Sequence, residues 1–294
     1  MLIHLIWQGS DFHAADPAFS LGLDHGFQRG WGVFETMLAV GSEIPFWSRH
    51  WARLQFGARK IEIPVPSEQA LLRAVQNSLP GAAQGVAGSM TSPPCFRLRL
   101  TITAGQGAHW TQPGEQSNGA LTGSLWSVPP IMAQQPGLRL LTYPHPFSTP
   151  TALQGCKHTS YLPWLLAARF ARNHDGDDAV LVQPNGEVIE TSHRNLFVWR
   201  DNQLWTPPLS SGCLPGVMRA LVLESASRLG LTVQEAPLTV ACCLQAECLF
   251  VTSAITFCQI VREWDGQTWN VASVPPQLGA LESDVRAKCF GKAV

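Results

Sequence analysis

Turn-forming residues divide the second half of the chain into short segments, and this spacing constrains the fold more than any other feature. The runs DAVLVQ and EVIE flank a turn at Pro184–Gly186, and NLFVWR and QLWTP flank Asp201–Asn202, which predicts two hairpins. Pro215 in the first turn and Gly230 at the C-terminus delimit a predicted helix, and another hairpin turns at Asp265–Gly266. Short, mostly antiparallel strands mixed with helices indicate the α+β class.

Apolar periodicity in the first half predicts a separate α+β lobe. Apolar residues recur at helical spacing over residues 44–64, and a second helical pattern starts at Glu68 and closes at Pro80–Gly81. The alternation in FRLRLTIT, residues 96–103, is that of a half-buried strand, and residues 2–7 predict another.

Proline density places a boundary between the two lobes. The run SVPPIMAQQPG, residues 127–137, combines the highest proline density with no regular pattern, as in a linker. We therefore expect an N-terminal α+β domain over residues 1–126, a linker over 127–137 and a C-terminal α+β domain over 138–294.

Charge and composition narrow the classes of partner. The chain of 294 residues is 45% apolar and 14% charged, which indicates a compact folded protein. Lysine and arginine total 20 against 21 acidic residues, so no global field predicts binding to nucleic acid or to an anionic membrane. Without an apolar run of ~18 residues or a signal-peptide pattern, a cytoplasmic protein is expected. The 8 cysteines lack metal-type spacing, so we expect them to be reduced, with no metal site.

Four features, each ordinary by itself, together match the needs of pyridoxal phosphate. Lys157 lies between a predicted strand and a helix, Glu190 ends a hairpin strand, and Arg53 lies on an amphipathic helix. The run LPGVMR, residues 214–219, brings proline and glycine to a helix N-terminus, where free N–H groups bind phosphate. The cofactor needs a lysine for its Schiff base, a group at its pyridine nitrogen and donors for its phosphate. Spacing alone does not show that these residues converge.

Six sequence blocks, in order, resemble the class IV aminotransferase family of fold-type IV pyridoxal phosphate enzymes. These blocks are LDHGFQRGWGVFET (23–36), HWARL (50–54), GCKHTSY (155–161), GEVIETSHRNLF (186–197), LPGVMR (214–219) and LFVTSAI (249–255). The resemblance implies a two-domain α+β fold like that of D-amino acid aminotransferase, with pyridoxal 5'-phosphate in the cleft between the domains. It also implies a homodimer acting on a small amino substrate.

The resemblance further implies roles for individual residues. Lys157 is expected to form the Schiff base, and Glu190 is expected at the pyridine nitrogen. The other implied cofactor ligands are Arg53 for the phosphate, Tyr161 for the phenolic oxygen, Asn195 near Glu190, the backbone N–H groups of Val217 and Met218, and the hydroxyl of Ser253 or Thr252.

Two reactions of the family are open to this chain. The run G-x-K-H at Lys157, the run V-M-R and the placement of Thr36 in F-E-T resemble 4-amino-4-deoxychorismate lyase, in which a hydroxyl assists proton transfer. Tyr161, in contrast, resembles the transaminases. Ala104 stands where an arginine commonly follows the strand, which departs from both patterns.

A dicarboxylate substrate needs cations, and arginine matches a carboxylate with two parallel hydrogen bonds. Arg29 occupies a position that lines the pocket in relatives, and Arg97 and Arg99 face one side of their strand. His109 lies in a predicted flexible loop, which is expected to close over the site. We expect Arg29, Arg97 and His109 to be substrate ligands, whereas three histidines beside motif residues are expected to be structural: His25, His158 and His193.

The expected function is therefore conversion of 4-amino-4-deoxychorismate to 4-aminobenzoate and pyruvate, a step of folate biosynthesis, with Lys157 and Thr36 as catalytic residues. A transaminase of D-amino or branched-chain amino acids is the alternative. A cofactor-binding homologue without turnover is the second alternative, although retention of Lys157, Glu190 and Arg53 argues against it.

Overall fold

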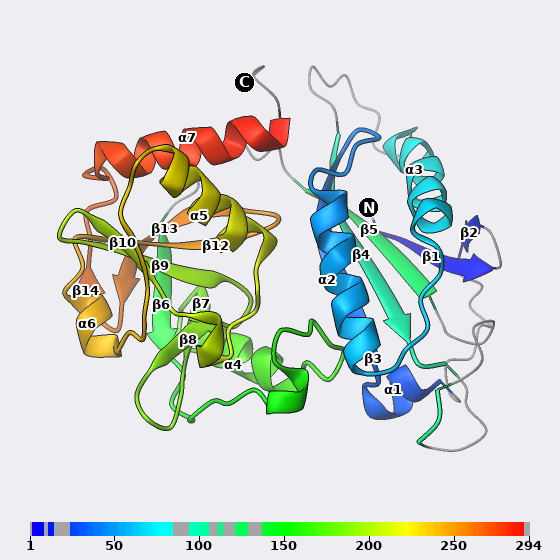
Figure 1. The fold of residues 1–294 in the computed structure, drawn as a ribbon, viewed down its shortest axis with the longest axis horizontal. Coiled ribbons are helices and arrows are strands. Elements are labelled where there is room, and N and C mark those ends of the chain that lie inside the picture. The colour runs from blue at the N-terminus through cyan, green and yellow to red at the C-terminus, as the bar shows by residue number, and fades with distance from the viewer. Residues whose placement is uncertain are drawn as a thin grey trace. The chain divides into compact units, whose positions relative to one another are not determined.

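The computed structural model describes residues 2–8, 11–14, 24–84, 94–105, 111–113, 121–128 and 137–290. The chain divides into two compact units (Figure 1). The first unit contains residues 1–133 and 156–161, and the second contains residues 134–155 and 162–294. The predicted linker lies mostly outside the described residues, so its bounds stay a prediction. The return of residues 156–161 to the first unit is not among the sequence-based predictions.

The first unit is built on a five-stranded sheet with the strand order β2-β1-β5-β4-β3, in which every pairing is antiparallel. Its strands are β1 (Leu2–Gln8), β2 (Asp11–Ala14), β3 (Gly32–Val40), β4 (Cys95–Thr103) and β5 (Leu121–Val128). The predicted strands at residues 2–7 and 96–103 correspond to β1 and β4, whereas β3 and β5 were not predicted as strands.

Three helices accompany this sheet: α1 (His25–Arg29), α2 (Trp47–Lys60) and α3 (Glu68–Gln84). Helix α2 crosses one face of the sheet (Figure 1), where Trp51 and Leu54 join Met37 of β3 in the core. Helix α3 continues past Pro80–Gly81, so the predicted end there is wrong. A proline inside a helix loses its own N–H bond and crowds the carbonyl four residues earlier, at a cost of about 3 kcal/mol. Burial of Leu71 and Leu79 in the core stabilises the helix around it.

Residues 157–160 fasten onto the edge strand of this sheet. The Phe34 N–H donates to the carbonyl of Lys157 at 2.8 Å, and the Thr159 N–H donates to the carbonyl of Gly32 at 2.9 Å. The hydroxyls of Thr159 and Ser160 both donate to the carbonyl of Gly30, at 2.7 and 2.9 Å. The backbone of Lys157 is therefore fixed to β3.

The second unit contains a nine-stranded mixed sheet with the order β11-β10-β9-β12-β13-β6-β7-β8, and β14 pairs with β13. The pairs β10–β11, β13–β6 and β6–β7 are parallel, and the others are antiparallel. The strands are β6 (Leu138–Thr142), β7 (Asp178–Val182), β8 (Val188–Thr191), β9 (Asn195–Arg200), β10 (Gln203–Thr206), β11 (Val233–Glu235), β12 (Cys248–Ser253), β13 (Phe257–Trp264) and β14 (Gln267–Thr268).

Helices cover this second sheet, with α5 and α7 packed against each other (Figure 1). The helices are α4 (Leu162–Asn173), α5 (Val217–Arg228), α6 (Val240–Leu244) and α7 (Pro276–Phe290), with short 3-10 turns at Thr151–Leu153 and Leu209–Ser211. Among the described residues, no helix is long and apolar enough to cross a membrane.

The turn residues act as the sequence predicts. Asp201–Asn202 and Asp265–Gly266 both have positive φ at the two central positions of their hairpins, which is the two-residue geometry that such dipeptides favour. Gly230 ends α5 with φ at +70°. Pro215 differs slightly from its prediction, because it precedes the N-cap Gly216 and lies outside the first helical turn.

Gly30 is a position where the fold requires glycine, since its φ is +68° and a Cβ there would lie 2.4 Å from Ser160 Oγ and 3.1 Å from Ser160 Cα. Gly230 has almost the same φ, but a Cβ there would meet nothing within 4 Å. We expect Gly230→Ala to cost about 1–2 kcal/mol of unfolding free energy, from the left-handed backbone alone. Gly30→Ala should cost about 1–3 kcal/mol more, from the clash.

Urea unfolding of each variant against the wild type measures this difference. Equal costs for the two glycine substitutions would contradict the close packing of residue 160 against Gly30.

Candidate active site

In the first unit, the amine of Lys157 lies beside two aromatic rings. Its Nζ is 4.6 Å from the ring centre of Phe34 and 5.8 Å from that of Tyr161. The two rings meet edge to face, with centres 5.4 Å apart. Phe34, which the sequence analysis did not single out, therefore brings two predicted site residues, Lys157 and Tyr161, together.

The same Phe34 ring also contacts a guanidinium. Arg99 Cζ lies 3.7 Å from the ring centre, and Arg99 Nε donates to Thr101 Oγ1 at 3.3 Å. Arg99 is half-buried, and within the described residues no carboxylate pairs with it. Burial, with a smaller contribution from Arg97, lowers the pKa of Arg99, but a guanidinium keeps its charge in proteins. Arg99 is therefore a partly dehydrated cation near Lys157.

Thr36 lies directly opposite Arg99 in the β3–β4 ladder, so the two side chains project from the same face of the sheet. Arg97 also belongs to this face, as the two-residue spacing predicts. Its side chain is exposed, and its Cζ lies 4.4 Å from the ring centre of Trp126. Of the two arginines in this strand, Arg99 has the surroundings of a binding residue.

Arg53 has a buried partner that the sequence analysis did not find. Its Nε and Nη2 each donate to a carboxylate oxygen of Glu35 at 2.7 Å, and His50 Nδ1 lies 2.8 Å from Glu35 Oε2. Burial alone would raise the pKa of Glu35, but Arg53 and His50 together lower it to about 2. The spacing H-x-x-R, which places His50 and Arg53 on one helix face, was the available signal.

The other predicted first-unit residues contribute less. Arg29 is exposed on α1, where its Nη1 lies 3.0 Å from His25 Nδ1 and also donates to Gln28 Oε1. Burial and the nearby Lys157 lower the pKa of the buried His158, which favours its neutral form. His109 lies outside the described residues.

In the second unit, the carboxylate of Glu190 is buried and held in position. Glu190 Oε2 accepts from Asn195 Nδ2 at 3.0 Å and from the Leu214 N–H at 3.2 Å. Asn195 Nδ2 also donates to the Leu214 carbonyl at 2.9 Å. The structure thus brings together two of the predicted motifs of this unit: the block that contains Glu190 and Asn195, and the loop LPGVMR.

That loop leads into the N-terminus of α5, which has the features of an anion site. The N-cap Gly216 makes no side-chain cap, so the first N–H groups of the helix, from Val217 and Met218, have no acceptor within it. A Cβ at Gly216 would lie 1.9 Å from Asn195 Oδ1, so only glycine fits there. The backbone amides at this helix end are therefore open to an anion.

A second feature points to the same ligand. Thr252 is 2% exposed, and its hydroxyl has no hydrogen-bond partner among the described residues. Thr252 pairs in register with Asn195 across β12 and β9, and β12 packs against α5. Ser253, in contrast, already pairs with the hydroxyl of Thr256 at 2.8 Å. Thr252 and Ser253 were the two predicted hydroxyl donors to the phosphate. Of these, the Thr252 hydroxyl lacks a protein partner within the described part of the chain.

The sequence profile described as amino-transferase class IV matches residues 32–264 of the chain. The protein belongs to the class IV aminotransferase family. The family-level resemblance is confirmed, and with it the expectation of an enzyme whose family cofactor is pyridoxal phosphate.

Individual members of the family resemble the chain at low identity. A Methanocaldococcus jannaschii protein provisionally named a branched-chain-amino-acid aminotransferase is 26% identical over 270 residues, which cover 90% of each chain. The aminodeoxychorismate lyase of Vibrio harveyi is 26% identical over 235 residues, 79% of this chain and 82% of the relative.

Among solved structures, a fold IV transaminase from Curtobacterium pusillum superimposes with a TM-score of 0.79. It is 21% identical, over 100% of both chains. This likeness confirms the fold-type IV, α+β class.

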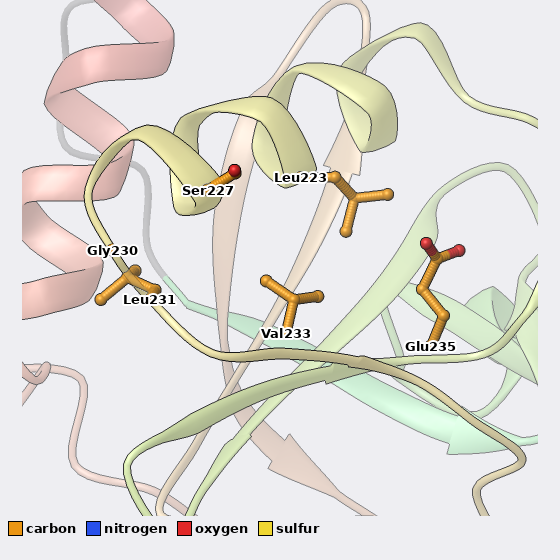
Figure 2. Close-up of a pocket in the computed structure, with 6 residues that line it drawn as sticks. All are labelled: Leu223, Ser227, Gly230, Leu231, Val233 and Glu235. Atoms are coloured by element: carbon orange, nitrogen blue, oxygen red, sulfur yellow. The ribbon is translucent and has the colours of Figure 1, made fainter.

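The second unit also has an open pocket, which contains none of the predicted site residues. It is formed by the C-terminal half of α5 and by β11 (Figure 2). Its lining residues are Leu223, Ser227, Gly230, Leu231, Val233 and Glu235. Glu235 pairs with Arg219 at 2.6 Å. None of the predicted site residues lines this pocket, so it is not part of the candidate active site.

The Glu35 carboxylate makes a pH-dependent contribution to stability. Its pKa falls from 4.5 to about 2 on folding, so the stabilisation is complete above pH 4.5 and is lost as the pH falls towards 2. We expect Glu35→Gln to cost about 3–5 kcal/mol at neutral pH, because it leaves Arg53 buried without its counter-charge. The variant should also show a shallower loss of unfolding free energy in that acid range.

Urea unfolding between pH 2 and 7 measures both effects, with the exposed Glu43 changed to glutamine as the control, expected within about 0.5 kcal/mol of wild type. Parallel pH profiles for the wild type and Glu35→Gln would contradict the ion pair.

Proposed function

We propose that this class IV enzyme converts 4-amino-4-deoxychorismate to 4-aminobenzoate and pyruvate. The observation that carries the proposal is the pairing of Thr36 with Arg99 on one face of the first-unit sheet, with Arg99 and Lys157 against the same Phe34 ring. A hydroxyl on the same sheet face as Phe34, and a cation that no carboxylate of the described residues neutralises, suit a substrate that must lose a proton and that carries carboxylates. Similarity to the Vibrio harveyi lyase supports the same reaction.

The second unit offers a set of groups that fits pyridoxal phosphate. In our proposal Glu190, held by Asn195 and the Leu214 N–H, contacts the pyridine nitrogen. The phosphate would accept hydrogen bonds from the N–H groups of Val217 and Met218 and from the hydroxyl of Thr252. That hydroxyl has no other partner among the described residues. When bound, the cofactor supplies an electron sink for the charge left on the substrate carbon.

The first unit would supply the remaining cofactor contacts. Lys157 is the proposed attachment point, and Tyr161, whose ring lies beside Lys157 Nζ, is the proposed donor to the phenolic oxygen. Arg53 is the proposed cation for the phosphate. Its bidentate bond to Glu35 occupies two of its five N–H groups and orients the guanidinium plane.

In the proposed reaction, the Lys157 amine takes the proton from the ring carbon that bears the substrate amine. The bond from the neighbouring ring carbon to the enolpyruvyl oxygen then breaks, and the leaving group takes up a proton to become pyruvate. The ring becomes aromatic as 4-aminobenzoate, so no water, acceptor or oxidant is consumed. Thr36 assists the proton transfer, and Arg99 binds a carboxylate, with Arg29 and Arg97 as further candidates.

Transamination of D-amino or branched-chain amino acids is the second candidate. Tyr161 is typical of the transaminases, and the Methanocaldococcus jannaschii relative covers more of this chain than the lyase does. The cytoplasmic location and the homodimer that the resemblance implies stay predictions.

An incubation with 4-amino-4-deoxychorismate and no keto acid separates these reactions. We expect equimolar 4-aminobenzoate and pyruvate over many turnovers, because the elimination needs no amino acceptor. Both products can be measured by chromatography. A protein that forms neither product, but converts its cofactor to the pyridoxamine form with D- or branched-chain amino acids, would contradict the lyase and establish the transaminase. Failure of both assays in protein that binds cofactor would identify a silent homologue.

Lys157→Ala tests the attachment residue. We expect it to abolish the visible absorption of bound cofactor and to lower turnover by at least about 10²-fold, because the amine that holds the cofactor and moves the proton is lost. Lys60→Ala, at an exposed lysine on α2, is the matched control and should retain both properties. Turnover that survives in Lys157→Ala at the wild-type rate would exclude Lys157 from the mechanism.

A further inference from the structure

A buried aspartate binds the residues that connect β8 to β9. It lies outside the six sequence blocks that resemble the family. Asp178 stands at the start of β7 and is fully buried. The last residue of β8 and the turn after it, together called the turn 191–194, are the four residues between Glu190 and Asn195, and each of them contacts the Asp178 carboxylate. These two flanking residues are the ones proposed to serve the cofactor ring.

Both oxygens of Asp178 are fully engaged. Oδ1 accepts from the Ala179 N–H at 2.9 Å, from the Ser192 N–H at 3.2 Å and from Ser192 Oγ at 2.5 Å. Oδ2 accepts from Thr191 Oγ1 at 2.8 Å and from Arg194 Nη1 at 2.6 Å, and His193 Nδ1 lies 3.3 Å away. Backbone, hydroxyl and cationic donors thus converge on one carboxylate.

This set of contacts keeps the carboxylate ionised. Burial alone would raise the pKa of Asp178, but His193, Arg194 and the Ser192 hydroxyl hold it below its usual value. A buried charge with one partner removed is costly, whereas a fully satisfied polar network fixes one geometry. The ionised carboxylate of Asp178 therefore holds the turn in one conformation, because its partners all come from Ala179 and from residues 191–194.

The strand pairing alone does not account for this network. The β7–β8 ladder pairs Val180 with Thr191 and Leu181 with Glu190, and the Ser192 N–H also donates to the Ala179 carbonyl at 2.9 Å. These backbone bonds would persist with an uncharged residue at position 178. What the carboxylate adds is control over the side chains and the path of residues 191–194, from which the chain enters β9 at Asn195.

The consequence reaches Glu190 through Asn195. Because Asn195 follows the turn directly, the path of the turn sets where its amide lies, and that amide holds Glu190 Oε2 and the Leu214 carbonyl. Any drift of the turn would therefore loosen the hold of Asn195 on the Glu190 carboxylate.

We propose that Asp178 is a positioning residue that aligns Glu190 with the pyridine nitrogen of the cofactor. This inference rests on the proposed role of Glu190, and it assigns to the turn 191–194 a function in cofactor affinity. In this proposal Asp178 acts through Asn195 and contacts neither cofactor nor substrate.

Two ligands test it: pyridoxal phosphate and its deaza analogue, in which a carbon replaces the ring nitrogen. Asp178→Asn keeps the shape of the side chain but presents an NH2 group to donors. We expect this variant to bind pyridoxal phosphate about tenfold more weakly, a coupling typical of one hydrogen-bond network. Its affinity for the analogue, which has no nitrogen for Glu190 to contact, should change less than about twofold. Dissociation constants come from tryptophan fluorescence of the apoprotein.

The control is Glu263→Gln, which removes the charge from another carboxylate of the same unit, one that accepts from Arg139 Nε at 2.9 Å. It should bind both ligands as the wild type does. If Asp178→Asn does not fold, as judged by circular dichroism, Ser192→Ala removes one donor and should show the same selective loss at smaller size.

Equal weakening for both ligands, or no weakening, would overturn the positioning role. Wild-type protein that does not prefer pyridoxal phosphate over the analogue would instead overturn the proposed role of Glu190, so the two failures are distinguishable.

Discussion

The structure depends on the pairing of residues 157–160 with the free edge of β3 and with Gly30 before it. Two N–H···O=C bonds and two hydroxyl bonds to the Gly30 carbonyl fix this segment. The pairing gives Lys157 an aromatic neighbour in Phe34 and places it on the sheet that carries Thr36 and Arg99. A flexible loop would leave the position of the Lys157 amine variable. Pairing with an ordered strand edge fixes its position relative to the Phe34 ring.

The two units use the same device to orient functional groups. Glu35 is buried under α2 and holds Arg53 and His50, and Asp178 is buried beside β8 and holds Arg194 and His193. In each case an ionised carboxylate is satisfied by an arginine and a histidine. Such clusters contribute little net stability compared with apolar packing, but they restrict the conformations of the side chains around them. This is the property that an enzyme needs near a cofactor.

Local signals in the sequence predicted much of the second unit, because its turns carry their own chemistry. Asp201–Asn202 and Asp265–Gly266 adopt the positive φ values that define tight hairpins, whatever surrounds them. The first unit was harder. Strand β3 begins inside the block LDHGFQRGWGVFET, which was interpreted as a functional motif and not as a strand. Strand β5 begins in a polar, glycine-rich stretch, and its pairing partners are distant in the chain. For the site, motif resemblance named Glu190, Asn195 and the loop before α5. The roles of Glu35, Phe34 and Asp178 depend on contacts between segments that no spacing reveals.

The crossing of residues 156–161 into the first unit has a consequence for the order in which the chain can mature. The N-terminal sheet lacks the partner of its edge strand until residues beyond 155 have been synthesised. During that interval the N–H and C=O groups of β3 that later bind residues 157 and 159 are open to pairing with another chain. The nascent protein therefore has a period in which its first unit is a template for misassembly, and a fragment that stops at residue 133 would remain in that state.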